Sequence, residues 1–186
     1  MLDLDAIFGR SARRTVEIGF GNGETLVAQA AARPTEDFLG IEVHRPGVGH
    51  LMLRCEELAV RNLRIICRDA VDAFERQLPP GSVDEVLLYF PDPWPKKRHH
   101  KRRLVQDEFV SLVASRLRSG GTLRLATDWQ PYADWMLETL GRCPLLRNES
   151  ADGAWSPRPA SRPPTRFELR GQRLGHEVRD LAYRRV

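Results

Sequence analysis

Short runs of Val, Ile and Leu alternate along the chain with longer stretches of helical period, and this alternation constrains the fold more than any other feature. The apolar runs predict strands at residues 14–20, 37–42, 63–67, 83–90 and 121–126. The intervening stretches predict helices at residues 23–33, 46–60, 70–77, 106–118 and 130–140. Apolar strands connected through helices are typical of a parallel sheet covered on both faces. The sequence therefore predicts an α/β fold with a doubly wound, mostly parallel sheet.

The chain has 186 residues, the size of one domain, so we expect a single domain over residues 1–186. A basic loop at 91–103 and a Pro-rich loop at 151–164 interrupt the regular pattern. After the second loop, TRFELRGQRLG predicts a short helix and HEVRDLAYRR predicts a final strand with Val, Leu and Tyr facing inward.

Apolar and cysteine patterns exclude several classes of protein. No apolar run approaches the roughly 18–20 residues that cross a bilayer, and the start of the chain lacks the order of a signal peptide. We therefore expect a cytoplasmic protein. The three cysteines are odd in number and outside any C-x-x-C pair, so neither a disulfide framework nor a zinc site is predicted. The histidines have no metal-ligand spacing, and we expect no metal.

The net charge of +4 is unevenly distributed. Segment 96–103, KKRHHKRR, holds six basic residues and no acid, and without it 23 basic residues stand against 25 acidic ones. A second cluster, from Ser156 onward, holds eight arginines and three acids. Two basic patches on an acidic body indicate one oriented polyanionic partner. The alternative is a solvated loop and a soluble tail.

Acidic residues stand in or just after the predicted strands. Ligands of open α/β sheets bind beyond the carboxyl ends of the strands, where strand order reverses. A single acid there is often a helix N-cap, which is the simpler interpretation for Asp69 alone. Five acids at corresponding places favour a binding site; they are Glu17, Glu42, Asp69, Asp92 and Asp128.

The first strand runs into a glycine turn, residues 19–23, which lets a ligand approach the backbone where a helix begins. Its glycines, Gly19, Gly21 and Gly23, do not complete the dinucleotide fingerprint, because Glu24 replaces the last glycine. That carboxylate would compete with a pyrophosphate for the same amides. S-adenosylmethionine carries no phosphate, and its sulfonium and ammonium charges suit an acidic rim. Glu42 lies where an acid accepts hydrogen bonds from ribose hydroxyls.

Several motifs together resemble those of the bacterial tRNA (guanine-N7)-methyltransferase family. They run in family order from about residue 14 to the C-terminus: VEIGFGNG, FLGIEVHRPGVG, CRDAV, FPDPWPKKRHHKRR, ATDWQPYADWML and TRFELRGQRLGHEVRDL. FPDPW with its basic tail and the last motif are the most specific. The resemblance implies a Rossmann-like, S-adenosylmethionine-dependent methyltransferase that modifies a guanine in the variable loop of tRNA.

The resemblance also assigns roles to residues. Glu17, Glu42, Asp69 and Asp92 would contact the cofactor or line its site, together with the three glycines of the turn. Asp92 would be the catalytic residue. The residues facing the substrate would be Lys96, Asp128, Thr165, Arg166, Phe167 and Glu168. The basic loop supplies the expected RNA contacts, which are Lys97, Arg98, Lys101, Arg102 and Arg103.

The chemistry at N7 of guanine is consistent with these roles. N7 has an in-plane lone pair and no proton, so the reaction needs no general base. Positive charge builds on the purine, and the Asp92 carboxylate would stabilise it. Asp128 and Glu168 are candidates for accepting hydrogen bonds from N1 and N2 of guanine. Trp94 would either stack on the base or pack its own loop onto the core.

Alternatives and departures from the family pattern accompany this interpretation. Glu168 could instead pair with Arg170 or Arg173. Arg166 replaces an expected lysine, and the chain begins about a dozen residues before the first strand, without the longer N-terminal arm expected of the family. A nicotinamide-dependent dehydrogenase is disfavoured by the broken glycine fingerprint. A non-catalytic RNA-binding relative is disfavoured by the acids at the strand ends.

Overall fold

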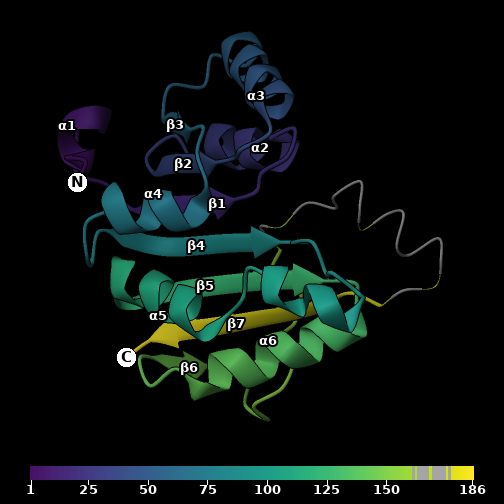
Figure 1. The fold of residues 1–186 in the computed structure, drawn as a ribbon. Coiled ribbons are helices and arrows are strands. Elements are labelled where there is room, and N and C mark those ends of the chain that lie inside the picture. The colour runs from purple at the N-terminus through teal and green to yellow at the C-terminus, as the bar shows by residue number, and fades with distance from the viewer. Residues whose placement is uncertain (161, 163–167, 169–174, 176) are drawn as a thin grey trace.

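The computed structural model describes residues 1–160, 162, 168, 175 and 177–186 of the chain. Its central feature is a seven-stranded sheet (Figure 1). The strands are β1 (Arg14–Ile18), β2 (Asp37–Ile41), β3 (Leu63–Ile66), β4 (Val83–Tyr89), β5 (Leu117–Thr127), β6 (Leu146–Asn148) and β7 (Arg179–Arg185).

One helix precedes β1, and the connections between the strands carry the others. The helices are α1 (Leu4–Phe8), α2 (Glu24–Ala32), α3 (Arg45–Glu57), α4 (Ala70–Arg76), the 3-10 helix η1 (Lys97–Arg102), α5 (Asp107–Arg116) and α6 (Gln130–Arg142). Each of the five helices predicted between the strands is present, with ends that differ by a few residues. Helix α1 and η1 were not predicted.

The order of the strands is β3-β2-β1-β4-β5-β7-β6. Strands β1 to β5 are parallel, whereas β7 runs antiparallel to both β5 and β6. The strand order reverses between β1 and β4, so this is the switch point where a doubly wound sheet binds its ligands. The predicted fold class, a doubly wound and mostly parallel α/β sheet, is confirmed.

Differences from the sequence prediction concentrate in the last part of the chain. Strand β5 begins four residues before the predicted Gly121, and the short strand β6 was not predicted. Strand β7 begins at Arg179 rather than at His176, but Leu181 and Tyr183 are buried as expected. The helix predicted over 165–175 lies mostly outside the described residues.

The two faces of the sheet are covered differently. Alternate strand residues such as Ile18, Leu88 and Leu125 pack beneath α4, α5 and α6 in one large apolar core. Figure 1 shows α5 and α6 lying along β5 and β7. A smaller core on the other face unites α2, α3 and β2 around Phe38. Because successive side chains of a strand point to opposite faces, Glu17, Tyr89 and Asp180 lie on this second face.

Candidate active site

The glycine turn after β1 adopts a backbone that only glycine accepts readily. Gly19, Gly21 and Gly23 have φ angles of +69°, +58° and +75°, in the left-handed region that costs other residues free energy. The Gly19 N–H donates to the Ile41 carbonyl at 2.8 Å, which fixes the turn to the end of β2. The turn therefore brings backbone to the switch point without side chains in the way.

The start of α3 closes over this turn. A Cβ atom on Gly47 would lie 2.1 Å from the Gly21 carbonyl oxygen, and one on Gly23 would lie 2.7 Å from Cδ1 of Leu51. Any side chain at these positions would push the turn and α3 apart. The sequence analysis did not identify Gly47, because its constraint comes from a residue 26 positions away in the chain.

Glu42 follows β2 and binds backbone amides with both carboxylate oxygens. Its Oε2 accepts from the Gly21 N–H at 2.9 Å. Its Oε1 accepts from the N–H groups of Val43 at 2.7 Å and His44 at 2.9 Å. The half-buried carboxylate thus joins the glycine turn to the start of α3. Each oxygen has two lone pairs and three of the four are used, so Oε2 could still accept from one ribose hydroxyl.

Glu17 is the buried acid of the site. It lies on β1 at 5% exposure, and within the described part of the chain its Oε2 has no hydrogen-bond partner. Burial raises the pKa of Glu17 to about 8. Tyr89 on the same face is half-buried, and the loss of hydration, followed by the charge of Glu17, raises the pKa of Tyr89. An unpaired buried carboxyl group is costly, and it marks this position as a candidate for receiving a cation.

Asp69 caps α4. Its Oδ1 accepts from the N–H groups of Val71 at 2.9 Å and Asp72 at 3.2 Å, and the residue is exposed. This agrees with the simpler interpretation, that of an N-cap. Its place after β3 leaves it at the same sheet edge as Glu42, because Ile66 pairs with Ile41.

Asp92 stands in a rigid loop after β4. Phe90 and Trp94 have φ angles of +52° and +44°, which cost about 1–3 kcal/mol each in residues other than glycine. The rings of Pro91, Pro93 and Pro95 fix the φ angles of these three residues, which alternate with Phe90, Asp92 and Trp94 along the loop. Asp92 itself is exposed. Strained backbone held in place by the surrounding structure often accompanies function, and here it presents a carboxylate at the end of β4.

The basic loop folds into η1 and packs on Trp94. The Arg102 guanidinium lies 5.0 Å from the Trp94 ring, and the His99 ring lies 5.8 Å from it. The cations Lys96, Lys97, Arg98, Lys101 and Arg102 are exposed. No ion pair joins any of these five to another described residue. The loop therefore presents positive charge beside Asp92 that no acid of the described residues neutralises.

Arg103 is buried, whereas the sequence analysis predicted an exposed residue that contacts RNA. It is 3% exposed, and its guanidinium lies 4.8 Å from the Tyr132 ring and 5.3 Å from the Trp135 ring. Its Nε donates to the Pro93 carbonyl at 3.0 Å, so it braces the Asp92 loop against α6. The buried guanidinium is not presented to solvent, and its position argues against the RNA contact predicted for Arg103.

Asp128 follows β5 at the same edge and is half-buried. It lines a hollow of about 330 Å³ together with Trp129, Gln130, Pro131 and Glu177. Tyr132 lies in the first turn of α6. Burial, with a smaller contribution from the Asp92 charge, raises the pKa of Tyr132 to about 12. The ends of β4 and β5 thus bring Asp92, Asp128 and the basic loop to one region.

Glu168 is buried in an ion-pair cluster. Its Oε2 accepts from Nη1 of Arg162 at 2.6 Å, and Arg158 lies 3.3 Å from its Oε1. Arg162 also binds Asp180 of β7. Arg170 and Arg173, the arginines considered from the sequence, lie outside the described residues. Thr165, Arg166 and Phe167, also predicted to face the substrate, lie outside the described residues.

The site therefore consists of a glycine cradle, strand-end carboxylates and a basic loop at the carboxyl edge of one α/β sheet. A family model described as "Putative methyltransferase" matches residues 11–181. The chain belongs to this methyltransferase family. The family predicted from the sequence is confirmed.

Curated relatives of this methyltransferase share most of its length. A protein of Leifsonia xyli subsp. xyli named tRNA (guanine-N(7)-)-methyltransferase is 58% identical over 184 residues, which cover 99% of this chain and 81% of the relative. A protein of the same name from Halorhodospira halophila is 53% identical over 184 residues, covering 99% of this chain and 80% of the relative.

A solved structure shows the fold of the methyltransferase. The 16S rRNA methyltransferase KamB superposes with a TM-score of 0.69 at 14% identity, and the match covers 99% of this chain and 93% of that structure. The Rossmann-like methyltransferase fold is thus confirmed. Among the residues described, no helix is long and apolar enough to cross a membrane.

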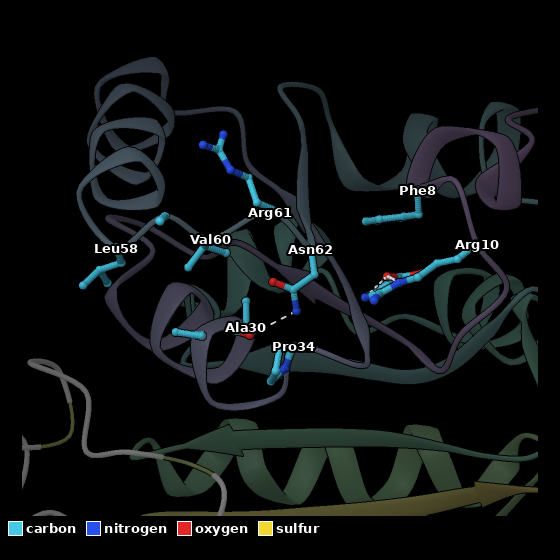
Figure 2. A pocket seen from close by; sticks show the side chains of 11 residues that line it. Phe8, Arg10, Ala30, Pro34, Leu58, Val60, Arg61 and Asn62 are labelled. Atoms are coloured by element: carbon cyan, nitrogen blue, oxygen red, sulfur yellow. Dashed lines mark hydrogen bonds and ion pairs between the residues drawn. The ribbon is translucent and has the colours of Figure 1, made fainter.

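The methyltransferase has another hollow, of about 400 Å³, at the opposite edge of the sheet (Figure 2). Phe8, Arg10 and Asn62 line it, and the Asn62 amide donates to the Ala30 carbonyl at 3.0 Å. The lining residues precede or begin β2 and β3, so this hollow contains none of the predicted site residues.

Sequence reasoning did not identify two buried charged residues next to the end of β4 and in β7, Arg162 and Asp180. Arg162 was counted only as one arginine of a basic cluster. Asp180 carried no local signal, because its partner Arg162 lies 18 residues away in the chain.

Proposed function

We propose that this protein transfers the methyl group of S-adenosylmethionine to N7 of a guanine in tRNA, in the variable loop, and that it does so in the cytoplasm. One observation carries the proposal: the glycine cradle and the buried Glu17 lie at the same sheet edge as Asp92 and a loop of exposed cations, and the described residues neutralise neither Glu17 nor these cations. The names of the close relatives support the guanine and the tRNA.

The residues at the ends of β1 and β2 fit the cofactor. The glycine turn leaves backbone open to a ligand, and Gly47 lies so close to Gly21 that a Cβ would fill the contact. The Oε2 atom of Glu17 is a buried acceptor without a partner among the described residues, suited to an ammonium group. We propose that Glu17 and the turn hold the amino acid end, that Glu42 accepts from the ribose, and that Asp69 lines the site.

The reaction requires positioning and charge stabilisation rather than proton removal. S-adenosylmethionine supplies a methyl group activated by its sulfonium. N7 of guanine attacks with its own lone pair, so no residue has to act as a base. Asp92, held by the proline loop and braced through Pro93 by Arg103, would lie beside the purine as it becomes positive. A fixed carboxylate lowers the free energy of that developing charge.

Guanine would be held by residues at the ends of β4 and β5. Asp128, beside the hollow, is suited to accept hydrogen bonds from N1 and N2 of guanine. Lys96, at the start of the basic loop, would approach the base or its phosphate. Since N7 faces a groove too deep and narrow for a protein pocket in A-form RNA, the base must come from a loop or be flipped out. Trp94 is half-buried under Arg102 and His99, so it is suited to form a wall of this pocket.

Incubation with radiolabelled S-adenosylmethionine and total tRNA tests the function. Chemical cleavage at 7-methylguanosine should then locate the labelled base at one guanine of the variable loop. The Asp92→Asn variant is the control, since it should bind tRNA and transfer little label. Label on another atom or region of the tRNA would contradict the proposed position, and binding without any transfer would favour a non-catalytic RNA-binding protein.

A further inference from the structure

Arg162 is the most completely buried charged side chain among the described residues of the second face. Its side chain has no exposed surface, and it makes two pairs of hydrogen bonds. Nη1 and Nη2 donate to the Glu168 carboxylate at 2.6 and 3.4 Å. Nε and Nη2 donate to the Asp180 carboxylate at 3.1 and 3.0 Å. One guanidinium thus joins two carboxylates that are distant in the sequence.

The cluster is sealed from water and tied to β7. Glu168 is 1% exposed and Asp180 is 6% exposed. Burial raises the pKa of Asp180 despite the charge of Arg162, which lowers it. The Asp180 carbonyl also accepts from the Ser156 N–H at 2.8 Å, and the Arg162 N–H donates to the Pro159 carbonyl at 3.0 Å. The guanidinium therefore has one orientation, fixed by both its side-chain and its backbone partners.

The guanidinium also lies against the end of β4. Its carbon is 5.5 Å from the centre of the Tyr89 ring and 5.6 Å from that of Phe90. Phe90 is the left-handed residue at which the chain leaves β4 toward Asp92, and its N–H donates to the Ala126 carbonyl at 2.8 Å. A cation held over these rings by two carboxylates restrains the base of the Asp92 loop.

We propose that Arg162 is a positioning residue for methyl transfer, which holds Glu168 and the start of the Asp92 loop in fixed places next to its guanidinium. The proposal rests on the proposed function for its activity readout. Lysine cannot replace this arginine, because one ammonium group cannot form two planar pairs with two carboxylates. The geometry rather than the charge is thus the required property.

A double-mutant cycle tests the proposal, with Arg162→Lys, Glu168→Gln and the double variant measured beside the wild type. We expect Arg162→Lys to lower kcat by at least about tenfold with little change in cofactor Kd, and the double variant to be no slower than the slower single variant. Hydrogen exchange at the Phe90 amide gives a readout independent of activity, and it should accelerate in Arg162→Lys. If Arg162→Lys does not fold, Asp180→Asn releases the same guanidinium and should give the same two results.

Arg14→Lys is the matched control. Arg14 is also buried, at 6% exposure, and it pairs with Asp5 at the opposite edge of the sheet. This variant should lose thermal stability yet keep kcat and Phe90 exchange below its Tm. Equal loss of kcat in Arg14→Lys, additive effects in the cycle, or unchanged kcat in Arg162→Lys would each overturn the proposal. If the Phe90 amide hydrogen exchanges slowly in the wild type but the wild type methylates no guanine, the result would instead contradict the proposed function.

Discussion

The two halves of the carboxyl edge of the sheet are built by different interactions. In the cofactor half, the loops after β1, β2 and β3, carboxylates bind backbone amides: Glu42 accepts from three N–H groups and Asp69 from two. In the substrate half, the loops after β4 and β5, arginine side chains pack on aromatic rings. Arg103 braces the Asp92 loop against α6, and Arg162 lies over Tyr89 and Phe90.

This difference suits the two proposed ligands. Backbone amides are placed by the strands themselves, so a site made from them has one shape and fits a small cofactor. The side chains of Tyr132 and Trp135 from α6, of Asp180 from β7 and of Arg162 can position a strained loop beside a large RNA. We therefore expect changes in the two halves to separate cofactor affinity from RNA binding and turnover.

The largest effect is expected from removing the charge of the basic loop, by replacing Lys97, Arg98, Lys101 and Arg102 with Ala. Each phosphate that the loop no longer neutralises should reduce the salt slope of log K by roughly 0.7–0.9. If the wild type and the variant have the same tRNA affinity near 1 M salt, the variant should bind tRNA on the order of a thousandfold more weakly than the wild type at 0.1 M salt. Binding titrations at several salt concentrations measure both quantities.

The matched control for the basic loop is Arg61→Ala with Arg147→Ala. Both arginines are exposed and lie toward the opposite edge of the sheet. The control should keep the wild-type salt slope, and cofactor affinity should be unchanged in both variants. An unaltered slope in the fourfold variant would show that the loop is only solvated, and would move the RNA surface to the C-terminal arginines.

Asp92→Asn should affect turnover within the same half. The change keeps the shape of the side chain and removes its charge, so turnover should fall on the order of a hundredfold. Single-turnover rates measure the chemical step, and equilibrium titrations should show smaller changes in the binding of tRNA and cofactor. A near-normal single-turnover rate would remove Asp92 from the mechanism.

Glu42→Ala should affect only the cofactor half. The N–H groups of Gly21, Val43 and His44 lose their acceptor, and one ribose hydroxyl loses its acceptor. Cofactor binding should weaken by roughly 1–3 kcal/mol, the scale for polar groups left without partners. Calorimetric titration measures this, and tRNA affinity serves as the internal comparison. Equal losses in both affinities would contradict a ribose role for Glu42.

Glu17→Gln should alter the pH dependence of stability. The carboxyl group loses its proton near pH 4.5 when unfolded and near pH 8 when folded, because burial disfavours its charge. Between these values unfolding releases a proton, so the wild type should lose stability as pH rises, by at most about 1.4 kcal/mol per pH unit. Urea unfolding at pH 5 to 8, without cofactor, should show a smaller decline in Glu17→Gln. Parallel curves would indicate that Glu17 is ionised in the folded protein.

The sequence predicted the local structure of the cofactor half better than that of the substrate half. The glycine turn and Glu42 could be identified because each is local: a strand, a turn and a helix follow one another along the chain. Arg103 was placed on the RNA surface because it ends a run of cations, and no local pattern distinguishes it from Arg102. Its burial depends on Tyr132 and Trp135, which α6 brings to the loop from about thirty residues away.

The sequence by itself determined the α/β class, the parallel strands and the family. Apolar periodicity and short motifs are local in the chain, so they can be recognised without knowing which distant residues are in contact. The tertiary structure decided which charges face water and which are buried. Arg102 and Arg103 are neighbours, yet Arg102 is exposed and Arg103 is buried. Arg162 is the centre of a cluster because β7 pairs with β5 and so places Asp180 next to it. A charge is buried only where partners from separate elements compensate its lost hydration, and those partners meet only in the folded chain.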